Sequence, residues 1–447
     1  MDLQIWLGST KIFLHESQQS KTYHDLAIDM KALSSAMQAR LRERQFFVVE
    51  AENSYTTYLR FLTLLHLGQV VLLSPSYQFH DVAYRDFLRT EIGADFIFWS
   101  RDQESASLSI PASASLPNKK FADLKQTQGY FVVRTSGSSG KKFKLVLHDL
   151  QRFITKYRRI GPHFQKTFAF SPAESIAGIE TLLEVISHQC ELVAAGDRLS
   201  PAVVTDLLKT YEVDYFQTTP TFLNLLVVAG QHRGDKLSSL RKIAYGSEPA
   251  QLTVLRAIGA CHPQIEFMHT YGMSEIGIQK TLTNPQDPSV FQLDAKFNPG
   301  RRIEGLVEVR SMTSLIRYLN EDSLPLKGEW FQTFDHVEME GEYWRVLGRT
   351  GDLINLAGRK FFPSEVETLL AGMADIQDVT VVKEANEFVG QILIVKVVVA
   401  PGTDAKTFHK KLKEFCERNL PFYMHPHKVI LSEDSEMNNR FKKVRRL

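Results

Sequence analysis

The sequence predicts an α/β protein with a large N-terminal domain and a small C-terminal α+β domain. Short apolar runs rich in β-branched and aromatic residues alternate with segments of helical spacing up to about Glu275. Several runs end in loops rich in Gly, Pro, Ser or Thr, and this repetition of strand, loop and helix indicates crossover connections in αβ-layered, mostly parallel sheets. After about Arg301 the pattern becomes richer in β structure, and beyond Asp352 it indicates a separate unit.

The first elements follow this alternation closely. Strands are expected at the apolar runs near residues 47–50, 69–75, 94–100 and 129–136. Between the first two, residues 55–68 have helical spacing and close on Gly68, a residue type common at helix C-termini.

The same alternation continues to Glu275. Helices are expected at 178–188 and 201–211, and strands at 190–195, 213–220, 240–249 and 265–275. The last three strands end in loops rich in Gly, Pro or hydroxyl residues. Ligands of parallel sheets bind beyond the carboxyl ends of the strands, so these loops are the expected binding site.

The C-terminal unit has its own pattern. A β-rich stretch ends at 341–352, and helices at 364–373 and 407–420 flank strands at 379–385 and 391–401. We therefore expect two domains, residues 1–351 and residues 352–447.

Composition narrows the class of protein. The chain of 447 residues is long enough for two or three domains, and its formal net charge of +2 gives no reason to expect a nucleic acid as partner. No signal peptide and no apolar run of membrane-spanning length are found. The cysteines are few, far apart and without metal-ligand spacing. These features predict a cytoplasmic protein that does not bind a membrane.

The stretch "TSGSSGKKFK" (135–144) places hydroxyl residues and glycines directly before three lysines. Gly and Ser are ordinary turn formers, so a surface linker is one interpretation. The other is a phosphate cradle of backbone N–H groups, hydroxyls and an ammonium. The loop alone does not decide between them.

Further motifs follow in a fixed order and decide the question. They are "YGSEPA" (245–250), "TYGMSE" (270–275), "GEWFQTFDHVE" (328–338), "GRTGDLINLAGRKFFPSEVE" (348–367) and "LPFYMHP" (420–426) with "NNRFKKVRRL" (438–447). From about Thr22 to Leu447 the chain resembles the superfamily of adenylate-forming enzymes, which includes acyl- and aryl-CoA synthetases, luciferases and the adenylation domains of peptide synthetases. Several motifs in order are far more specific than any one of them.

The resemblance implies an ATP site. The phosphate-binding residues are Thr135, Ser136, Gly137, Ser138, Ser139, Gly140 and Lys144, with Lys141 or Lys142 as alternatives to the last. The adenine would lie against Gly246, Ser247, Glu248, Pro249, Tyr271, Gly272 and Met273. Ser274 would bind phosphate, Glu275 would bind Mg²⁺, and Asp335 and Arg349 would hold the ribose.

The resemblance also implies a mobile C-terminal lid. Asp352 would be the hinge, and Gly358, Arg359 and Lys360 would line the site of thioester formation. Lys442 matches the catalytic lysine of adenylation. The chain departs from the family pattern at Phe143 (usually Pro), Phe334 (Gly), Asn355 (Lys), Ala357 (Arg) and Phe441 (Gly).

The acid pocket is expected at Ser171, Ser175, Gly178 and Gly277. Ser171 stands where amino-acid-activating relatives have Asp, and a buried ammonium without a carboxylate is costly, so an α-amino acid is not expected. The implied reaction turns an aryl or short-to-medium acyl acid into an acyl-adenylate, and then into a thioester of CoA. A carrier-protein phosphopantetheine is an alternative acceptor.

An alternative of another class is a degenerate nucleotide-binding protein without activity. The departures from the family pattern favour it. The retained Glu275, Asp335, Arg349 and Lys442 weigh against it, since a mere binder has no need of the catalytic lysine.

Overall fold

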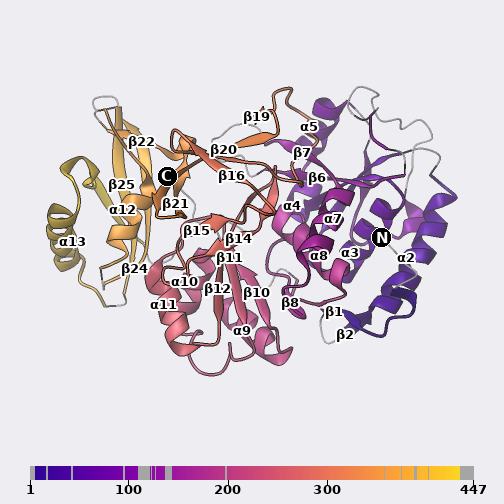
Figure 1. Cartoon of the computed structure of the whole chain (residues 1–447), viewed down its shortest axis with the longest axis horizontal. Coiled ribbons are helices and arrows are strands. Elements are labelled where there is room, and N and C mark those ends of the chain that lie inside the picture. Colours follow the sequence, from indigo (N-terminus) through magenta and orange to yellow (C-terminus); the bar gives the residue numbers. More distant parts are fainter. Residues whose placement is uncertain are drawn as a thin grey trace.

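The predicted α/β fold is confirmed by the structure (Figure 1). The computed structural model describes residues 6–16, 19–41, 44–93, 96–108, 121, 123–125, 127–135, 143–196, 199–356, 358–373, 375–386, 390–400 and 402–432. Most of these residues form helices and sheets of one large part. A smaller part, from β22 (Ile354–Leu356) to β26 (Lys428–Ser432), lies at one end of the molecule.

The first sheet is mostly parallel, as predicted. Within the described residues its strand order is β13-β12-β11-β10-β8-β9-β1-β2, parallel from β12 to β1 and antiparallel at both edges. These strands are β1 (Ile12–Glu16), β2 (Gln19–Thr22), β8 (Lys166–Phe168), β9 (Glu191–Ala194), β10 (Tyr215–Thr218), β11 (Lys242–Gly246), β12 (Glu266–Met273) and β13 (Gly277–Gln279). The carboxyl ends of β11 and β12 therefore carry the "YGSEPA" and "TYGMSE" motifs side by side.

The second sheet is parallel over β6, β4, β3 and β5 and antiparallel at β7 and β18. Its strands are β3 (Phe46–Ala51), β4 (Val70–Pro75), β5 (Ile97–Trp99), β6 (Tyr130–Arg134), β7 (Leu145–Asp149) and β18 (Arg317–Tyr318). Successive side chains of a strand point to opposite faces, and in β3 Phe47 and Val49 enter one core while Phe46 and Val48 enter another. Burial on both faces explains why this strand is apolar throughout.

Helices cover both sheets in layers. The core between the sheets holds α2 (Tyr23–Gln38), α3 (Tyr55–His66), α7 (Leu150–Ile160) and α8 (Ile176–His188). The outer face of the first sheet packs on α9 (Pro201–Thr210), α10 (Pro220–Val228) and α11 (Leu252–Cys261), and that of the second on α4 (Ser76–Phe79) and α5 (Val82–Ile92). None of the helices described has the length and apolar character that crossing a bilayer requires.

A third sheet is antiparallel and begins at Thr281, earlier than the Arg301 at which the sequence pattern becomes β-rich. Its order within the described residues is β14-β15-β21-β20-β17-β16, with β19 on β20. The strands are β14 (Thr281–Thr283), β15 (Phe291–Leu293), β16 (Gly300–Ile303), β17 (Leu306–Val309), β19 (Leu326–Lys327), β20 (Trp330–Glu340) and β21 (Tyr343–Arg349). Its core includes Tyr271 and Met273, so this sheet packs on the end of β12.

The small C-terminal part has a core of its own. The hairpin of β22 and β23 (Arg359–Phe361) precedes α12 (Pro363–Leu370), and α13 (Ala405–Asn419) packs on the sheet of β24 (Ile376–Asn386), β25 (Gly390–Val399) and β26. Short 3₁₀ turns lie at η1 (Ser105–Ser107), η2 (Thr350–Asp352) and η3 (Phe422–Met424). The core of this part draws only on residues from Ile354 onward.

One buried ion pair joins α7 and α8 to the edge of the first sheet. The Lys156 ammonium contacts the Glu180 carboxylate, and both side chains are almost fully buried. Glu180 also accepts hydrogen bonds from the Tyr157 hydroxyl and the Ile278 N–H. Lys156 donates in addition to the Ile278 carbonyl. A buried charge that loses its partner is costly, so this cluster fixes the helices against β13.

The Lys156→Met variant should therefore be unstable. We expect a loss of about 3–5 kcal/mol in the free energy of unfolding, measured by urea denaturation, because the buried Glu180 carboxyl loses the cation that pairs with it. The matched control is Lys209→Met. Lys209 pairs with Asp235 at 2.7 Å, but both side chains are at least half exposed, so its loss should cost under about 1 kcal/mol. Equal losses in the two variants would contradict the expectation.

Candidate active site

The base of the hydroxyl-rich loop is closed by a pair of residues. The Thr135 N–H donates to the Lys144 carbonyl at 3.0 Å, and the Lys144 N–H donates to the Thr135 Oγ1 at 3.0 Å. Phe143, at the position where the family usually has Pro, contacts Tyr84 and Phe87 edge-on or tilted. The predicted residues Ser136, Gly137, Ser138, Ser139 and Gly140, with Lys141 and Lys142, lie outside the described residues.

Lys144 lies close to the predicted metal ligand. Its ammonium is 2.7 Å from the Glu321 carboxylate and 4.5 Å from the centre of the Tyr318 ring. The Tyr318 hydroxyl donates to Glu275 Oε1 at 3.1 Å. Burial and the Glu275 carboxylate raise the pKa of Tyr318, so the hydroxyl stays protonated and donates. The structure thus brings the end of the loop and Glu275 to one place.

A second cluster forms where the third sheet meets β12. Asp335 is 6% exposed and accepts from the Tyr271 hydroxyl at 2.6 Å and from Arg349 Nε at 3.0 Å. Burial alone lowers the pKa of Arg349, but the Asp335 and Glu275 carboxylates raise it above its ordinary value. Tyr271 stacks on Phe291 on one side of its ring, with ring centres 5.6 Å apart. Tyr271, Asp335 and Arg349 therefore contact one another, and the Glu275 carboxylate lies near enough to Arg349 to act on its charge.

Phe334 keeps a backbone conformation that suits glycine. Its φ is +61°, in the left-handed region, where residues other than Gly, Asn and Asp are uncommon. The family usually has Gly at this position, and within β20 Phe334 adopts the backbone conformation that Gly favours. The Thr350 hydroxyl donates to the Phe334 carbonyl at 3.2 Å and helps to hold this conformation. Ser247, in the adenine motif, also has a positive φ of 71°.

His148 supports the turn that carries Ser274 and Glu275. It is fully buried, stacks on Phe131, and its Nε2 lies 2.6 Å from the Ser274 carbonyl. Burial lowers the pKa of His148 to about 4, so the neutral ring donates its Nε2–H to this carbonyl. The Glu275 carbonyl accepts from the Leu315 N–H at 2.7 Å on the other side of the turn.

The predicted acid-pocket residues surround the start of α8. Ser175 caps this helix, accepting from the Gly178 N–H at 3.0 Å and donating to the Pro172 carbonyl at 2.7 Å. A Cβ on Gly277 would clash with the Glu180 carboxylate, so this position requires glycine. Ser171 lies just before the cap, and its carbonyl accepts from Asn53 Nδ2 at 3.1 Å.

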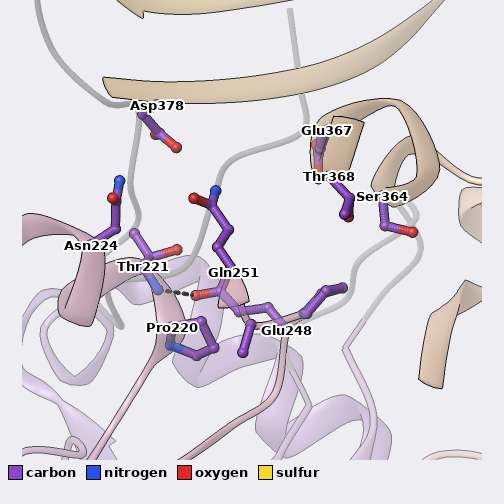
Figure 2. Close-up of a pocket in the computed structure, with 11 residues that line it drawn as sticks. Pro220, Thr221, Asn224, Glu248, Gln251, Ser364, Glu367, Thr368 and Asp378 are labelled. Atoms are coloured by element: carbon purple, nitrogen blue, oxygen red, sulfur yellow. Dashed lines mark hydrogen bonds between the residues drawn. The ribbon is translucent and has the colours of Figure 1, made fainter. Parts of the chain in front are cut away.

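A cleft separates the large and small parts beside the adenine motif (Figure 2). The Thr221 N–H of α10 donates to the Glu248 carboxylate at 2.9 Å, and Gln251 points into the cleft between α10 and α12. Asn224 Nδ2 donates to the Gln377 carbonyl at 3.0 Å and joins the two parts. Glu248 and Pro249, both predicted to face the adenine, line this cleft.

The residues of the predicted hinge and thiol site occupy the junction itself. Asp352 ends η2, and Lys383 of the small part donates to the Gly351 and Leu353 carbonyls at 3.0 and 2.9 Å. Gly358, Arg359 and Lys360 form the turn and second strand of an exposed hairpin with Asn355. Ala357, Phe441 and the predicted catalytic Lys442 lie outside the described residues.

Sequence reasoning missed the residues that link these motifs. Tyr318 ends β18 at the edge of the second sheet, and Asn320 and Glu321 follow it. Asn320 donates to the Phe143 carbonyl and accepts from the Leu145 N–H. Nothing in the sequence around them signals that they adjoin the phosphate loop. Their role appears only when β18 pairs with β7.

Comparison with known proteins identifies the family to which this chain belongs. The model of the AMP-binding enzyme family matches residues 8–293, and that of the AMP-binding enzyme C-terminal domain matches residues 365–442. A 4-coumarate–CoA ligase of Oryza sativa subsp. japonica is 27% identical over 219 residues, 43% of this chain and 38% of the relative. A 2-succinylbenzoate–CoA ligase of Listeria innocua serovar 6a is 21% identical over 95% of this chain and 93% of the relative.

Solved structures share the fold. The anthranilate CoA ligase AuaEII, solved with anthranoyl-AMP, has a TM-score of 0.79 and 16% identity, covering 99% of this chain and 94% of that one. At this identity the likeness supports the fold alone.

Asp335→Asn should weaken nucleotide binding. The variant keeps an oxygen for Tyr271 but loses the charge that faces Arg349, so we expect AMP to bind about 10- to 100-fold more weakly by titration calorimetry. Asp287→Asn is the matched control, because Asp287 pairs with Arg345 at 2.9 Å away from the site. Unchanged AMP affinity in Asp335→Asn would show that this carboxylate does not contribute to nucleotide binding.

His148 should make stability depend on pH. Its folded pKa of about 4 is below the unfolded value of 6.5, so the unfolded chain binds the extra proton and stability falls as the pH drops through 6.5. Between pH 8 and pH 5 this residue should lower the free energy of unfolding of the wild type by about 2 kcal/mol. Urea denaturation of the wild type and of His148→Phe at both pH values measures this difference. Parallel pH profiles would show that the histidine is not responsible.

Proposed function

The chain belongs to the AMP-binding enzyme family, and from this we propose that it is an acid–thiol ligase. It uses ATP and Mg²⁺ to activate a carboxylic acid without an α-amino group, of aryl or short-to-medium acyl type, as an acyl-adenylate. It then transfers the acyl group to the thiol of CoA. The relatives named 2-succinylbenzoate–CoA ligase and 4-coumarate–CoA ligase support this chemistry and its acceptor, without naming the acid.

One arrangement carries the proposal most directly. Glu275, Asp335 and Arg349 meet in one site, with Lys144 and Tyr318 beside Glu275. Two carboxylates beside two cations suit a metal-bound nucleotide rather than a bare anion. A chain that only needed a stable core has no need to gather these four charged groups where the antiparallel sheet meets the end of β12.

In the first step the substrate carboxylate attacks the α-phosphorus of ATP. A new P–O bond forms, the bond between the α-phosphorus and the bridging oxygen breaks, and pyrophosphate leaves. Both reactants are anions, so the main task of the protein is to hold them in line and to offset their charge. Lys144 and the hydroxyl loop would hold the pyrophosphate end, and Lys442 would stabilise the charge on the bridging oxygen.

The residues present fit a magnesium ion. Glu275 is half-buried, and the Tyr318 hydroxyl occupies one of its oxygens, which leaves carboxylate lone pairs for a hard cation. When bound, Mg²⁺ would neutralise charge on the phosphate oxygens. Asp335 would orient the ribose at the opposite end of the site.

In the second step a thiolate attacks the carbonyl carbon of the adenylate. The C–S bond forms, the C–O bond to phosphate breaks, and AMP leaves as a good leaving group. We propose Asp352 as the pivot of residues 352–447, which would bring Gly358, Arg359 and Lys360 to the acyl group between the steps. Lys383 of the small part donates to the carbonyls on both sides of Asp352, so these two bonds would have to change when the small part rotates about Asp352.

Pyrophosphate release from MgATP tests the proposal. It would be measured with benzoates, fatty acids, hydroxy acids and amino acids, each with and without CoA. We expect release with one class of non-amino acid and multiple turnovers with CoA. Lys442→Ala should slow the adenylation step by about 10²- to 10³-fold, because it removes a positioned charge from the transition state.

The outcomes separate the alternatives. Lys443→Ala is the control, since this neighbour also carries one positive charge but is not assigned to the reaction. A single slow turnover that CoA does not accelerate would indicate a carrier protein as acceptor. ATP binding without release for any acid would instead favour the inactive nucleotide-binding protein.

A further inference from the structure

The lysine at the end of the hydroxyl-rich loop already has a counter-ion. The Lys144 ammonium lies 2.7 Å from the Glu321 carboxylate and 4.5 Å from the centre of the Tyr318 ring. An ammonium pairs with a carboxylate or with a phosphate through the same three donors. The group to which the proposed function gives the pyrophosphate end of ATP is therefore paired with an acid of the chain itself.

The backbone around Lys144 keeps this pair together. Asn320 donates to the Phe143 carbonyl at 2.9 Å and accepts from the Leu145 N–H at 2.8 Å. It therefore holds the chain on both sides of Lys144. Glu321 directly follows Asn320 in the sequence, so the same two bonds keep its carboxylate next to the Lys144 side chain.

A second carboxylate lies near the same lysine. The Tyr318 hydroxyl donates to Glu275 Oε1 at 3.1 Å, and the Lys144 ammonium lies over the ring of this tyrosine. Burial, the Glu275 carboxylate and, to a smaller extent, the Glu321 carboxylate raise the pKa of Tyr318. Both carboxylates thus act on one hydroxyl. An anion that approaches Lys144 meets their negative charges as well as the ammonium.

The pair is open to solvent and easily broken. The side chains of Lys144 and Glu321 are 36% and 35% exposed. Ion pairs with this exposure hold together weakly, because water screens their attraction. A triphosphate carries several negative charges against the single charge of a carboxylate, so it can take the place of Glu321 beside the ammonium.

We propose that Glu321 is the internal counter-ion of Lys144, which the β- and γ-phosphates of ATP displace when they bind. This inference rests on the proposed function, because it takes Lys144 to hold the pyrophosphate end of ATP. Glu321 is a positioning residue, since it acts through the Lys144 ammonium. A lysine that is paired part of the time binds its ligand more weakly. Glu321 therefore weakens the binding of both ATP and pyrophosphate, and pyrophosphate leaves more readily after the first step.

Glu321→Gln tests this role by removing the charge and keeping the shape. The amide still offers an oxygen to Lys144 but carries no negative charge. Titration calorimetry of the full chain, without an acid substrate, should give dissociation constants about two- to fivefold lower for MgATP and for magnesium pyrophosphate. The constant for AMP should not change, because AMP lacks the two outer phosphates. The difference should shrink at high ionic strength, since salt screens partly exposed charges.

Two further variants show whether the effect involves Lys144. Lys144→Met should weaken MgATP and magnesium pyrophosphate binding at least about tenfold and leave AMP binding unchanged. Glu266→Gln is the matched control. Glu266 pairs with Lys242 at 3.1 Å, but the two residues begin β12 and β11, at the end of the sheet opposite the motif loops. It should leave all three constants unchanged.

The direction of the change decides the outcome. A disordered loop would weaken MgATP binding, so equal or weaker binding in Glu321→Gln overturns the inference. Equal tightening of AMP overturns it too, as does a Lys144→Met variant that binds MgATP like the wild type. Pyrophosphate release by the wild type with unchanged MgATP affinity in Glu321→Gln would overturn the inference and leave the ligase intact. Tighter MgATP binding without release for any acid would support the inference and overturn the ligase.

Discussion

The site depends on one carboxylate that two sheets share. Asp335 belongs to β20 of the antiparallel sheet, and its partner Tyr271 belongs to β12 of the parallel sheet. Arg349, at the end of β21, closes the other side of the same carboxylate. Because Asp335 is buried, these bonds are strong and costly to break. They fix the antiparallel sheet on the strand ends, and the small C-terminal part begins shortly after Arg349, at Ile354.

The fold class was accessible from the sequence, because strands buried on both faces give apolar runs such as the one at Phe46–Val49. The antiparallel third sheet was not recognised as such. Its first two strands, β14 and β15, have three residues each and are partly exposed, so they carry little apolar signal before Arg301. The order of the motifs along the chain identified the family, and the match to the family model confirms it. The order could not give the contacts of Tyr318 and Glu321, which depend on strand pairing between distant segments.

The departures from the family pattern also have physical explanations. Phe334 replaces a glycine yet keeps a positive φ, since Thr350 and the Asp335 cluster hold the turn from both sides. Phe143 replaces a proline and instead packs on Tyr84 and Phe87, which anchors the end of the loop through its side chain. Ser175, expected in the acid pocket, caps α8. In these places the side chains of this chain make contacts that hold the backbone, which weakens the argument that altered motifs imply lost activity.

The polar groups beneath the acid pocket are of two kinds. Lys156 and Glu180 satisfy each other, and their burial fixes α7 and α8 against β13. Gln279 donates to the Ile276 and Gly277 carbonyls, and its buried Oε1 has no partner among the described residues. The same hairpin thus carries a paired ionic network and, one residue further, an amide whose two donors hold the turn before β13.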